Sequence, residues 1–249
     1  MPLFVGHARS IDYAPFVEDG KVWHMEREIV EMAPMDVIVE SYDFDYFIEG
    51  DTVIVGQACK KVYSWNLDNT GELAYECALY EGDRVVYLIP VGSEEARTLY
   101  DFRHTAGEQV VVGCINSTGG ADELFLKQVR VADIGGTGRR AFGFAEERED
   151  LTNWWVEGVG TEFGPFRTLG LMPGNQYFLK SCELNGRVIC GVGDIAAMND
   201  IGRPSGCDAT GDGRVAARCE RRHQRTAGKT VSPQQLPHSE MQAAGLRSE

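Results

Sequence analysis

Near residue 210, oxygen-bearing residues have the spacing of a calcium-binding loop. Such a loop takes ligands from its positions 1, 3 and 5, a glycine at position 6 for a sharp turn, and a backbone carbonyl at position 7. These positions are filled by Asp208, Thr210, Asp212, Gly213 and Arg214. Position 12, where a bidentate acid is expected, is Cys219. The motif therefore predicts a weak and incomplete calcium site.

The sequence contains no complete motif of a known catalytic site. None of the five histidines has the i, i+4 spacing of a helical metal pair, and the chain has no G-x-S-x-G nucleophile elbow. Glu157 and Glu162 could pair as the two carboxylates of a glycoside hydrolase. Because acidic residues are abundant, we expect both to occupy solvated strand or loop positions. The sequence leaves enzymatic activity open and favours a protein without it.

An aromatic cluster lies close to these two acids. Trp154, Trp155, Phe163 and Phe166 would stack on sugar rings or a partner if they were exposed, and would form core if they were buried. The core interpretation is favoured. The exposed alternative predicts a glycan-binding module or carbohydrate-active enzyme with an aromatic and acidic cleft.

The seven cysteines include no C-x-x-C pair, so zinc-ribbon and thioredoxin-like sites lack their spacing. Cys182 and Cys190 flank Asn185-Gly186, the favoured two-residue hairpin turn, and their placement on the two strands suggests a disulfide. That turn would place Cys182 opposite Ile189 and direct Cys190 to the other face of the hairpin. We therefore expect buried free thiols, with Cys77 as the clearest case.

The elements that position these residues are predicted to be short strands. Alternating or β-branched stretches cover residues 43–48, 52–55, 61–65, 73–80, 85–89, 110–112, 124–131, 140–144, 154–157, 177–182 and 187–190. Turns are expected at Gly50-Asp51, Gly82-Asp83 and Asn185-Gly186, and a further hairpin turn is expected within residues 135–140. Residues 26–35 could instead form a short helix, which Pro34 would limit, with a strand as the rival. The pattern predicts an all-β fold, an antiparallel meander forming a sandwich or open barrel.

Charge divides the chain unevenly. The 249 residues contain 24 Lys and Arg against 38 Asp and Glu, a net charge of −14. Residues 201–249 instead carry eight basic and five acidic residues and no aromatic ring. We expect a flexible N-terminus at 1–11, an all-β body at 12–198, a linker with the partial calcium loop at 199–215, and a disordered tail at 216–249. The acid excess argues against nucleic acid as a partner, and no apolar run reaches membrane-spanning length.

Dispersed motifs in the body resemble a group of secreted β-rich Bacteroidetes proteins. The motifs are DYAPFVEDGKVWHM at 12–25, GDTVIVGQACKKVY at 50–63, LYDF at 99–102, and WVEGVGT at 155–161 followed by Gly164-Pro165. The resemblance implies a β-rich fold and a secreted or cell-surface location, and it implies no reaction. Residues 1–8 lack a basic flank and a long enough apolar core for a secretory signal. Either the recorded start lies downstream of the true one, or the protein is cytoplasmic.

The calcium motif resembles the first half of a dockerin, a module that binds cohesins and attaches secreted proteins to scaffolds. After Val215 a dockerin would continue with an acid and an amphipathic helix, whereas this chain continues AARCERRH. A frameshift after Val215 would explain the change. The combined prediction is a non-catalytic, secreted or surface-associated β-protein with a structural, adhesive or scaffold-attachment role. Its expected partner is a cohesin-like protein, another cell-surface protein or a glycan.

Overall fold

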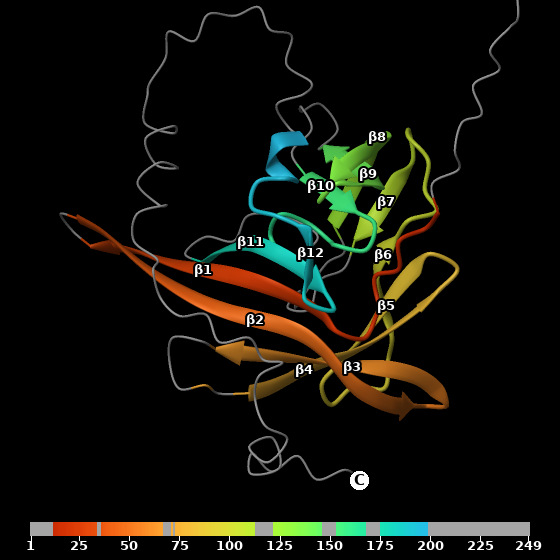
Figure 1. Cartoon of the computed structure of the whole chain (residues 1–249), viewed down its shortest axis with the longest axis horizontal. Helices are drawn as coiled ribbons and strands as arrows, with labels where there is room; N and C mark the ends of the chain where they lie inside the picture. The colour runs from red at the N-terminus through yellow and green to blue at the C-terminus, as the bar shows by residue number, and fades with distance from the viewer. Residues whose placement is uncertain are drawn as a thin grey trace, which may run out of the picture. The chain divides into compact units, whose positions relative to one another are not determined.

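The computed structural model describes residues 12–33, 36–66, 71, 73–112, 122–145, 153–167 and 175–198. All of them belong to the first of two units into which the chain divides, Met1–Gly202. These described residues form β-strands in two curled antiparallel sheets and no α-helix (Figure 1). The all-β prediction is therefore confirmed. The N-terminal segment 1–11, the linker 199–215 and the tail 216–249 lie outside the described residues.

The larger sheet has eight strands, in the order β12-β11-β1-β2-β3-β4-β5-β6. Their bounds are β1 Lys21–Ala33, β2 Asp36–Ile54, β3 Gln57–Asn66, β4 Leu73–Gly82, β5 Val85–Pro90, β6 Arg97–Asp101, β11 Asn175–Leu184 and β12 Arg187–Cys190. The smaller sheet has the order β10-β9-β8-β7, with β7 Gln109–Val112, β8 Asp122–Ile134, β9 Thr137–Ala145 and β10 Asn153–Val156.

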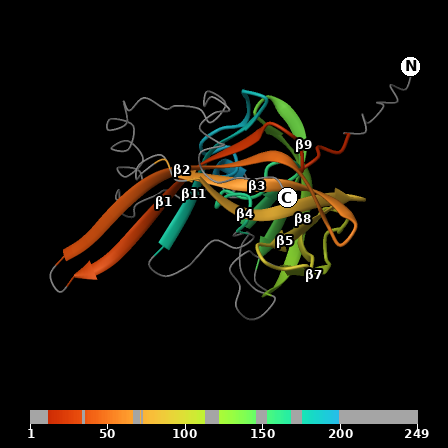
Figure 2. The ribbon, with the colours of Figure 1, turned by 90° about the horizontal axis from the view of Figure 1, so that it is seen from below.

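Strands β1 and β2 form a ribbon that extends past its neighbours (Figure 2). Toward the tip of the ribbon, β1 and β2 stay paired as far as Ala33 and Asp36. The pairing of β1 with β11 reaches only Ile29, and the pairing of β2 with β3 reaches only Phe44. The helical alternative for residues 26–35 is wrong for the described part of that segment. Continuous pairing with β2, and with β11 as far as Ile29, satisfies the backbone there as a strand.

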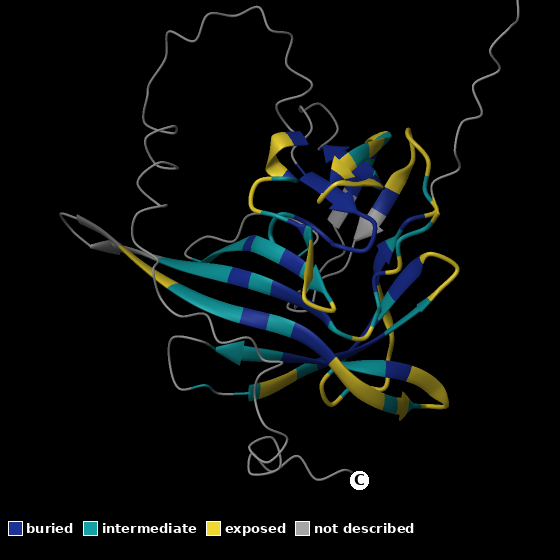
Figure 3. Ribbon diagram, in the orientation of Figure 1, coloured by how far each residue is buried: buried dark blue, intermediate teal, exposed yellow. Residues whose placement is uncertain are grey.

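One hydrophobic core joins the inner faces of the two sheets (Figure 3). From the larger sheet it takes Trp23 and Leu79, and from the smaller sheet Phe142 and Trp155, each at most 1% exposed. The indole N–H of Trp23 donates to the Val159 carbonyl oxygen at 2.7 Å, which satisfies its polar atom inside the core.

The turn predicted at Gly50-Asp51 is wrong. Strand β2 continues through both residues, and the irregular pairing between Ile48 and Asp51 is a bulge in which Gly50 has φ +80°. Glycine tolerates that conformation without strain, so it bends the strand and does not end it. The chain reverses at Val55-Gly56 instead, where the β-branched Val55 has φ +50°.

The other predicted turns fare better. The β4–β5 hairpin exists, but its centre is Asp83-Arg84, one residue beyond the predicted position, with both residues at positive φ. The two-residue turn at Asn185-Gly186 is confirmed, and the hairpin turn expected within residues 135–140 lies at Gly135-Gly136. Both turns have positive φ at both central residues.

The predicted orientation of Cys182 and Cys190 is also wrong. The pairing of β11 with β12 shifts between Cys182 and Glu183, and Cys182 lies opposite Cys190. Ile189 is the extra residue of this irregularity, which restores Cys190 to the core face. The expectation of buried free thiols is confirmed for both residues and for Cys77.

Within the described residues, no helix has the length and apolarity needed to cross a membrane.

Candidate functional site

The inner face of the larger sheet contains an aromatic pocket of about 430 Å³. Five strands contribute to it, and its rings alternate with charged and amide side chains. Its described lining consists of Arg27, Ile29, Tyr42, Phe44, Tyr46, Ser64, Asn66, Glu76 and Tyr177. All of these side chains are half-buried, so a ligand could contact them without the fold opening.

Strand alternation explains why these residues share one face. Successive side chains of a strand point to opposite sides, so Arg27 follows Trp23 and Met25 on the inner face of β1. Phe44 and Tyr46 likewise precede Ile48 on β2. The same face therefore changes along each strand from the sealed core to the aromatic pocket.

The rings of the pocket are continuous with the core. Phe44 packs edge-on against Tyr46 at 5.0 Å and against Tyr177 at 6.1 Å between ring centroids. Tyr46 packs edge-on against Phe166 at 4.9 Å, and Phe166 is only 4% exposed. These contacts fix the aromatic surface before any ligand arrives, which lowers the entropic cost of binding.

Arginine side chains flank the ring of Tyr177. The guanidinium of Arg27 donates from Nε and Nη2 to Asn175 Oδ1, at 3.1 and 2.8 Å. Its carbon Cζ lies 5.7 Å from the Tyr177 centroid, and that of Arg167 lies 3.5 Å from the same centroid. The cation–π contacts and the Asn175 acceptor orient Arg27 toward the pocket it lines.

A carboxylate forms the opposite wall. Glu76 is the extra residue where the β3–β4 pairing shifts, and its Oε1 accepts a hydrogen bond from Ser64 Oγ at 2.6 Å. Burial, assisted by the negative charge of Glu76, raises the pKa of the Tyr46 hydroxyl well above its usual range. Tyr46 therefore remains a neutral hydrogen-bond donor at every physiological pH.

The predicted calcium ligands Asp208, Thr210, Asp212 and Arg214 lie outside the described residues. Within the ranges that the structure describes, no three His, Cys, Asp or Glu side chains gather closely enough to hold a metal ion.

Glu157 occupies a different environment from the one predicted. Its side chain is fully buried and pairs with Arg140 Nη1 at 3.3 Å, while its backbone oxygen accepts from Arg139 Nη1 at 3.1 Å. Burial raises the pKa of Glu157, and Arg140 partly offsets that effect. The predicted solvated position is wrong because these arginines compensate the acid inside the protein. Glu162 is half-buried, and burial raises its pKa. Among the described contacts, no hydrogen bond joins it to Glu157.

Three of the four residues in the predicted aromatic cluster belong to the core. Trp154 and Trp155 are at most 1% exposed and Phe166 is 4% exposed, while Phe163 is half-buried. The two tryptophans are therefore sealed away from ligands. The aromatic residues that do line a pocket, such as Tyr42, Phe44 and Tyr46, were not singled out from the sequence. Their alternation was visible, but a strand pattern does not reveal which stretch of a face remains accessible.

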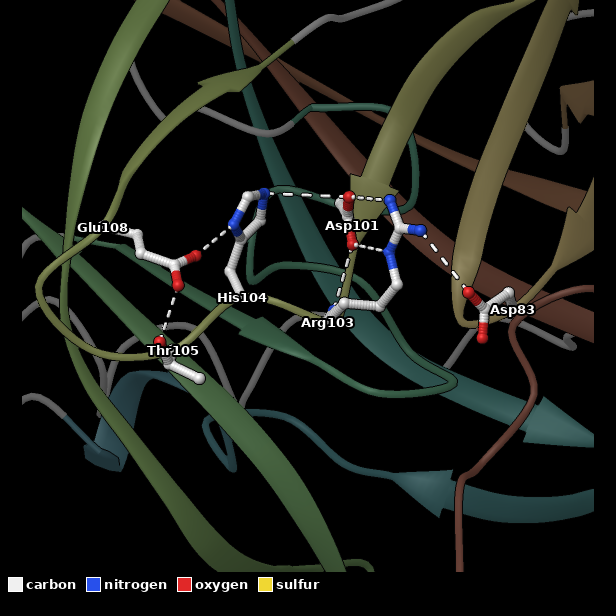
Figure 4. Close-up of polar contacts among 6 residues, drawn as sticks. All are labelled: Asp83, Asp101, Arg103, His104, Thr105 and Glu108. Atoms are coloured by element: carbon white, nitrogen blue, oxygen red, sulfur yellow. Dashed lines mark hydrogen bonds and ion pairs between the residues drawn. The ribbon is translucent and has the colours of Figure 1, made fainter.

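Outside the aromatic pocket, a cluster of polar side chains lies at the end of β6 and in the loop that follows it (Figure 4). His104 Nδ1 lies 2.6 Å from Glu108 Oε2, and Thr105 Oγ1 donates to the other oxygen of Glu108 at 2.7 Å. The Arg103 guanidinium donates to the Asp101 carboxylate at 2.9 and 2.6 Å. In these hydrogen bonds His104 and Thr105 both contact the Glu108 carboxylate and do not contact each other. The arrangement therefore differs from a nucleophile pair, in which the imidazole accepts the hydroxyl proton. The cluster instead fixes the loop between β6 and β7.

No family model matches this chain, and no curated protein or solved structure is significantly similar to it.

Proposed function

We propose that this chain is a non-catalytic, secreted or surface-associated β-protein that binds a glycan through the aromatic pocket and so serves an adhesive role. The observation that carries the proposal is the composition of the pocket: half-buried aromatic rings bordered by Arg27, Asn66, Ser64 and Glu76. Its volume lies within the range typical of small-ligand sites.

The chemistry of a sugar ring fits this lining. One face of a pyranose presents C–H bonds that pack on an aromatic ring, and its rim presents hydroxyl groups that need donors and acceptors. Tyr42 and Phe44 offer ring surface, while the Arg27 guanidinium donates and the Glu76 carboxylate accepts. A purely apolar ligand would displace water from these charged groups without offering them hydrogen bonds in return.

The number of carboxylates in the described pocket lining favours binding without turnover. Glycoside hydrolysis ordinarily requires two carboxylates on either side of the scissile bond. Glu76 is the single carboxylate among the described lining residues, and it already accepts a hydrogen bond from Ser64.

A glycan array followed by calorimetry tests the proposal. The wild-type chain should bind a defined set of glycans, and Tyr177→Ala and Glu76→Gln should each weaken binding at least about tenfold, the loss of about 1.4 kcal/mol. Tyr80→Ala is the matched control, because Tyr80 shares strand β4 with Glu76 but does not line the pocket. Its ring stacks instead on that of Tyr87, with 4.6 Å between the ring centroids. Binding that is absent, or that is unchanged in both pocket variants, contradicts the proposal, and so does glycan turnover.

The proposal also gives the C-terminal segment an attachment role. Asp208, Thr210, Asp212 and the carbonyl of Arg214 would hold calcium weakly and present a cohesin-like or other surface partner with its docking site. Calorimetric titration of the full chain with calcium tests this part. Heat at millimolar calcium that disappears in Asp208→Ala supports it, and no heat at that concentration removes the site.

A further inference from the structure

Cys182 and Cys190 face each other across the antiparallel pair β11 and β12. Directly opposed residues in such a pair have Cα atoms about 4.5 or 5.5 Å apart, depending on the position in the hydrogen-bond pattern. A disulfide accommodates Cα separations of about 4.4–6.8 Å. Either separation falls within the range that a disulfide accommodates.

The irregularity at Ile189 is what creates this pair, and neighbouring structure holds it in place. A Cβ on Gly135 would lie 2.4 Å from the Ile189 backbone oxygen, so the β8–β9 turn packs directly on the bulged residue. Just beyond Cys190, the Gly191 N–H donates to Asp194 Oδ2 at 2.7 Å. Both cysteines are 0% exposed and belong to the main core, so both side chains point to the same, inner face of the sheet.

We propose that Cys182 and Cys190 are a thiol pair that a small-molecule disulfide converts to an intramolecular disulfide, locking the edge strand β12 onto β11. This modification site is separate from the aromatic pocket and does not rest on the proposed glycan binding.

The reaction balances by thiol–disulfide exchange. The thiolate of one cysteine attacks the small-molecule disulfide, forms a mixed disulfide and releases one small thiol. The second cysteine then attacks the protein sulfur of that mixed disulfide and releases the second small thiol. Two S–H bonds and one S–S bond of the oxidant are exchanged for one protein S–S bond and two small thiols.

The exchange requires a local opening of β12. Burial raises the pKa of both thiols to about 12, so the closed structure contains almost no thiolate at neutral pH. Strand β12 has four residues and lies at the edge of its sheet, with Arg187 and Val188 exposed. An edge strand this short opens at lower cost than the core, and the thiols then regain their ordinary pKa.

Mass spectrometry of the full chain, incubated with glutathione disulfide and then alkylated, tests the proposal. In a Cys207→Ser background, trypsin places Cys182 in peptide 181–187 and Cys190 as the single cysteine of peptide 188–214. We expect these two peptides to become linked, faster in dilute urea that opens edge strands. Linking should raise Tm by on the order of 5 °C, and a reducing agent should reverse the shift.

Cys77 is the matched control, because it is equally buried but lies opposite Pro90 and should remain a free thiol. Cys190→Ser should abolish both the linked peptides and the Tm shift. Recovery of Cys182 and Cys190 as alkylated thiols or as separate glutathione adducts, even after refolding with the oxidant, overturns the proposal. A linked pair that lowers Tm overturns the locking of β12.

Discussion

The inner face of the larger sheet has two ends that the same strands build differently. At the core end, Trp23 and Leu79 are completely buried against residues of the smaller sheet. At the pocket end, Tyr42 and Tyr177 are only half-buried and lie beside charged side chains. Burial of apolar surface stabilises the core end, whereas the pocket end is open enough to accommodate the polar side chains of Arg27 and Glu76. One continuous face can thus supply both stability and recognition.

The sharpest contrast between the two ends should appear in unfolding. Trp23→Ala removes a completely buried indole and its 2.7 Å hydrogen bond to Val159. We expect it to lower the free energy of unfolding by about 3–5 kcal/mol, measured by urea denaturation. A loss below about 1 kcal/mol would mean that the core end is not sealed.

On the outer face of the larger sheet, behind the core end, His24 should make the free energy of unfolding depend on pH. His24 Nδ1 lies 2.7 Å from Asp45 Oδ1, and Nε2 lies 3.4 Å from Glu183 Oε1. Burial lowers the pKa of His24, but the hydrogen bond and charge of Asp45, with Glu183, outweigh burial and raise it overall. The folded pKa of His24 exceeds the unfolded one, so its interactions with Asp45 and Glu183 stabilise the fold. This stabilisation is complete below the unfolded pKa of about 6.5 and is lost as pH rises through the folded pKa.

Urea denaturation of His24→Gln and wild type between pH 5.5 and 9 measures this contribution. The variant should be less stable by about 1–2 kcal/mol at pH 5.5, and the difference should shrink as pH rises. Asp45→Asn should flatten the same dependence. A difference that grows with pH would contradict the charged state inferred for His24.

At the pocket end, Tyr177→Ala should cost much less stability than Trp23→Ala. The ring is half-buried, and its contacts with Arg27 and Arg167 leave both arginines able to return to water. We expect a loss of about 1 kcal/mol in urea denaturation, together with the loss of glycan affinity described above. A loss as large as that of Trp23→Ala would make Tyr177 part of the core.

The smallest effect should come from a turn that belongs to neither end. Val55 has φ +50°, a conformation unfavourable for a β-branched side chain, and Gly56 follows at +79°. Val55→Asn would create the preferred Asn-Gly turn and should raise stability by about 0.5–1 kcal/mol, visible as a Tm increase of about 2 °C. Val53→Asn is the control on the adjacent strand, where Val53 is exposed without positive φ, and it should bring no gain.

Much of the fold could be predicted from local pattern. The Asn185-Gly186 and Gly135-Gly136 turns follow from residues that accept positive φ, and the alternation around Phe44 identifies a strand. The Gly50 bulge could not be predicted, because a glycine with positive φ suits a bulge as well as a turn. The register between Cys182 and Cys190 depended in the same way on one extra residue, Ile189, that no local preference specifies.

The candidate site was harder to predict for a related reason. Trp154 and Trp155 were the conspicuous aromatic pair, and they are core, whereas Glu157 beside them is buried against Arg140. The aromatic pocket joins residues from β1, β2, β3, β4 and β11, which are separated by up to 150 positions in the chain. Their proximity arises only when the strands take their order in the sheet.

By itself, the sequence determined that this protein is built of antiparallel strands, because side-chain alternation and turn chemistry are local properties of the chain. Tertiary structure decided which part of each strand face became core and which became pocket. It also placed Glu157 beside Arg140 and Cys182 opposite Cys190. Burial and register depend on what lies across the sheet, and those partners are distant in sequence.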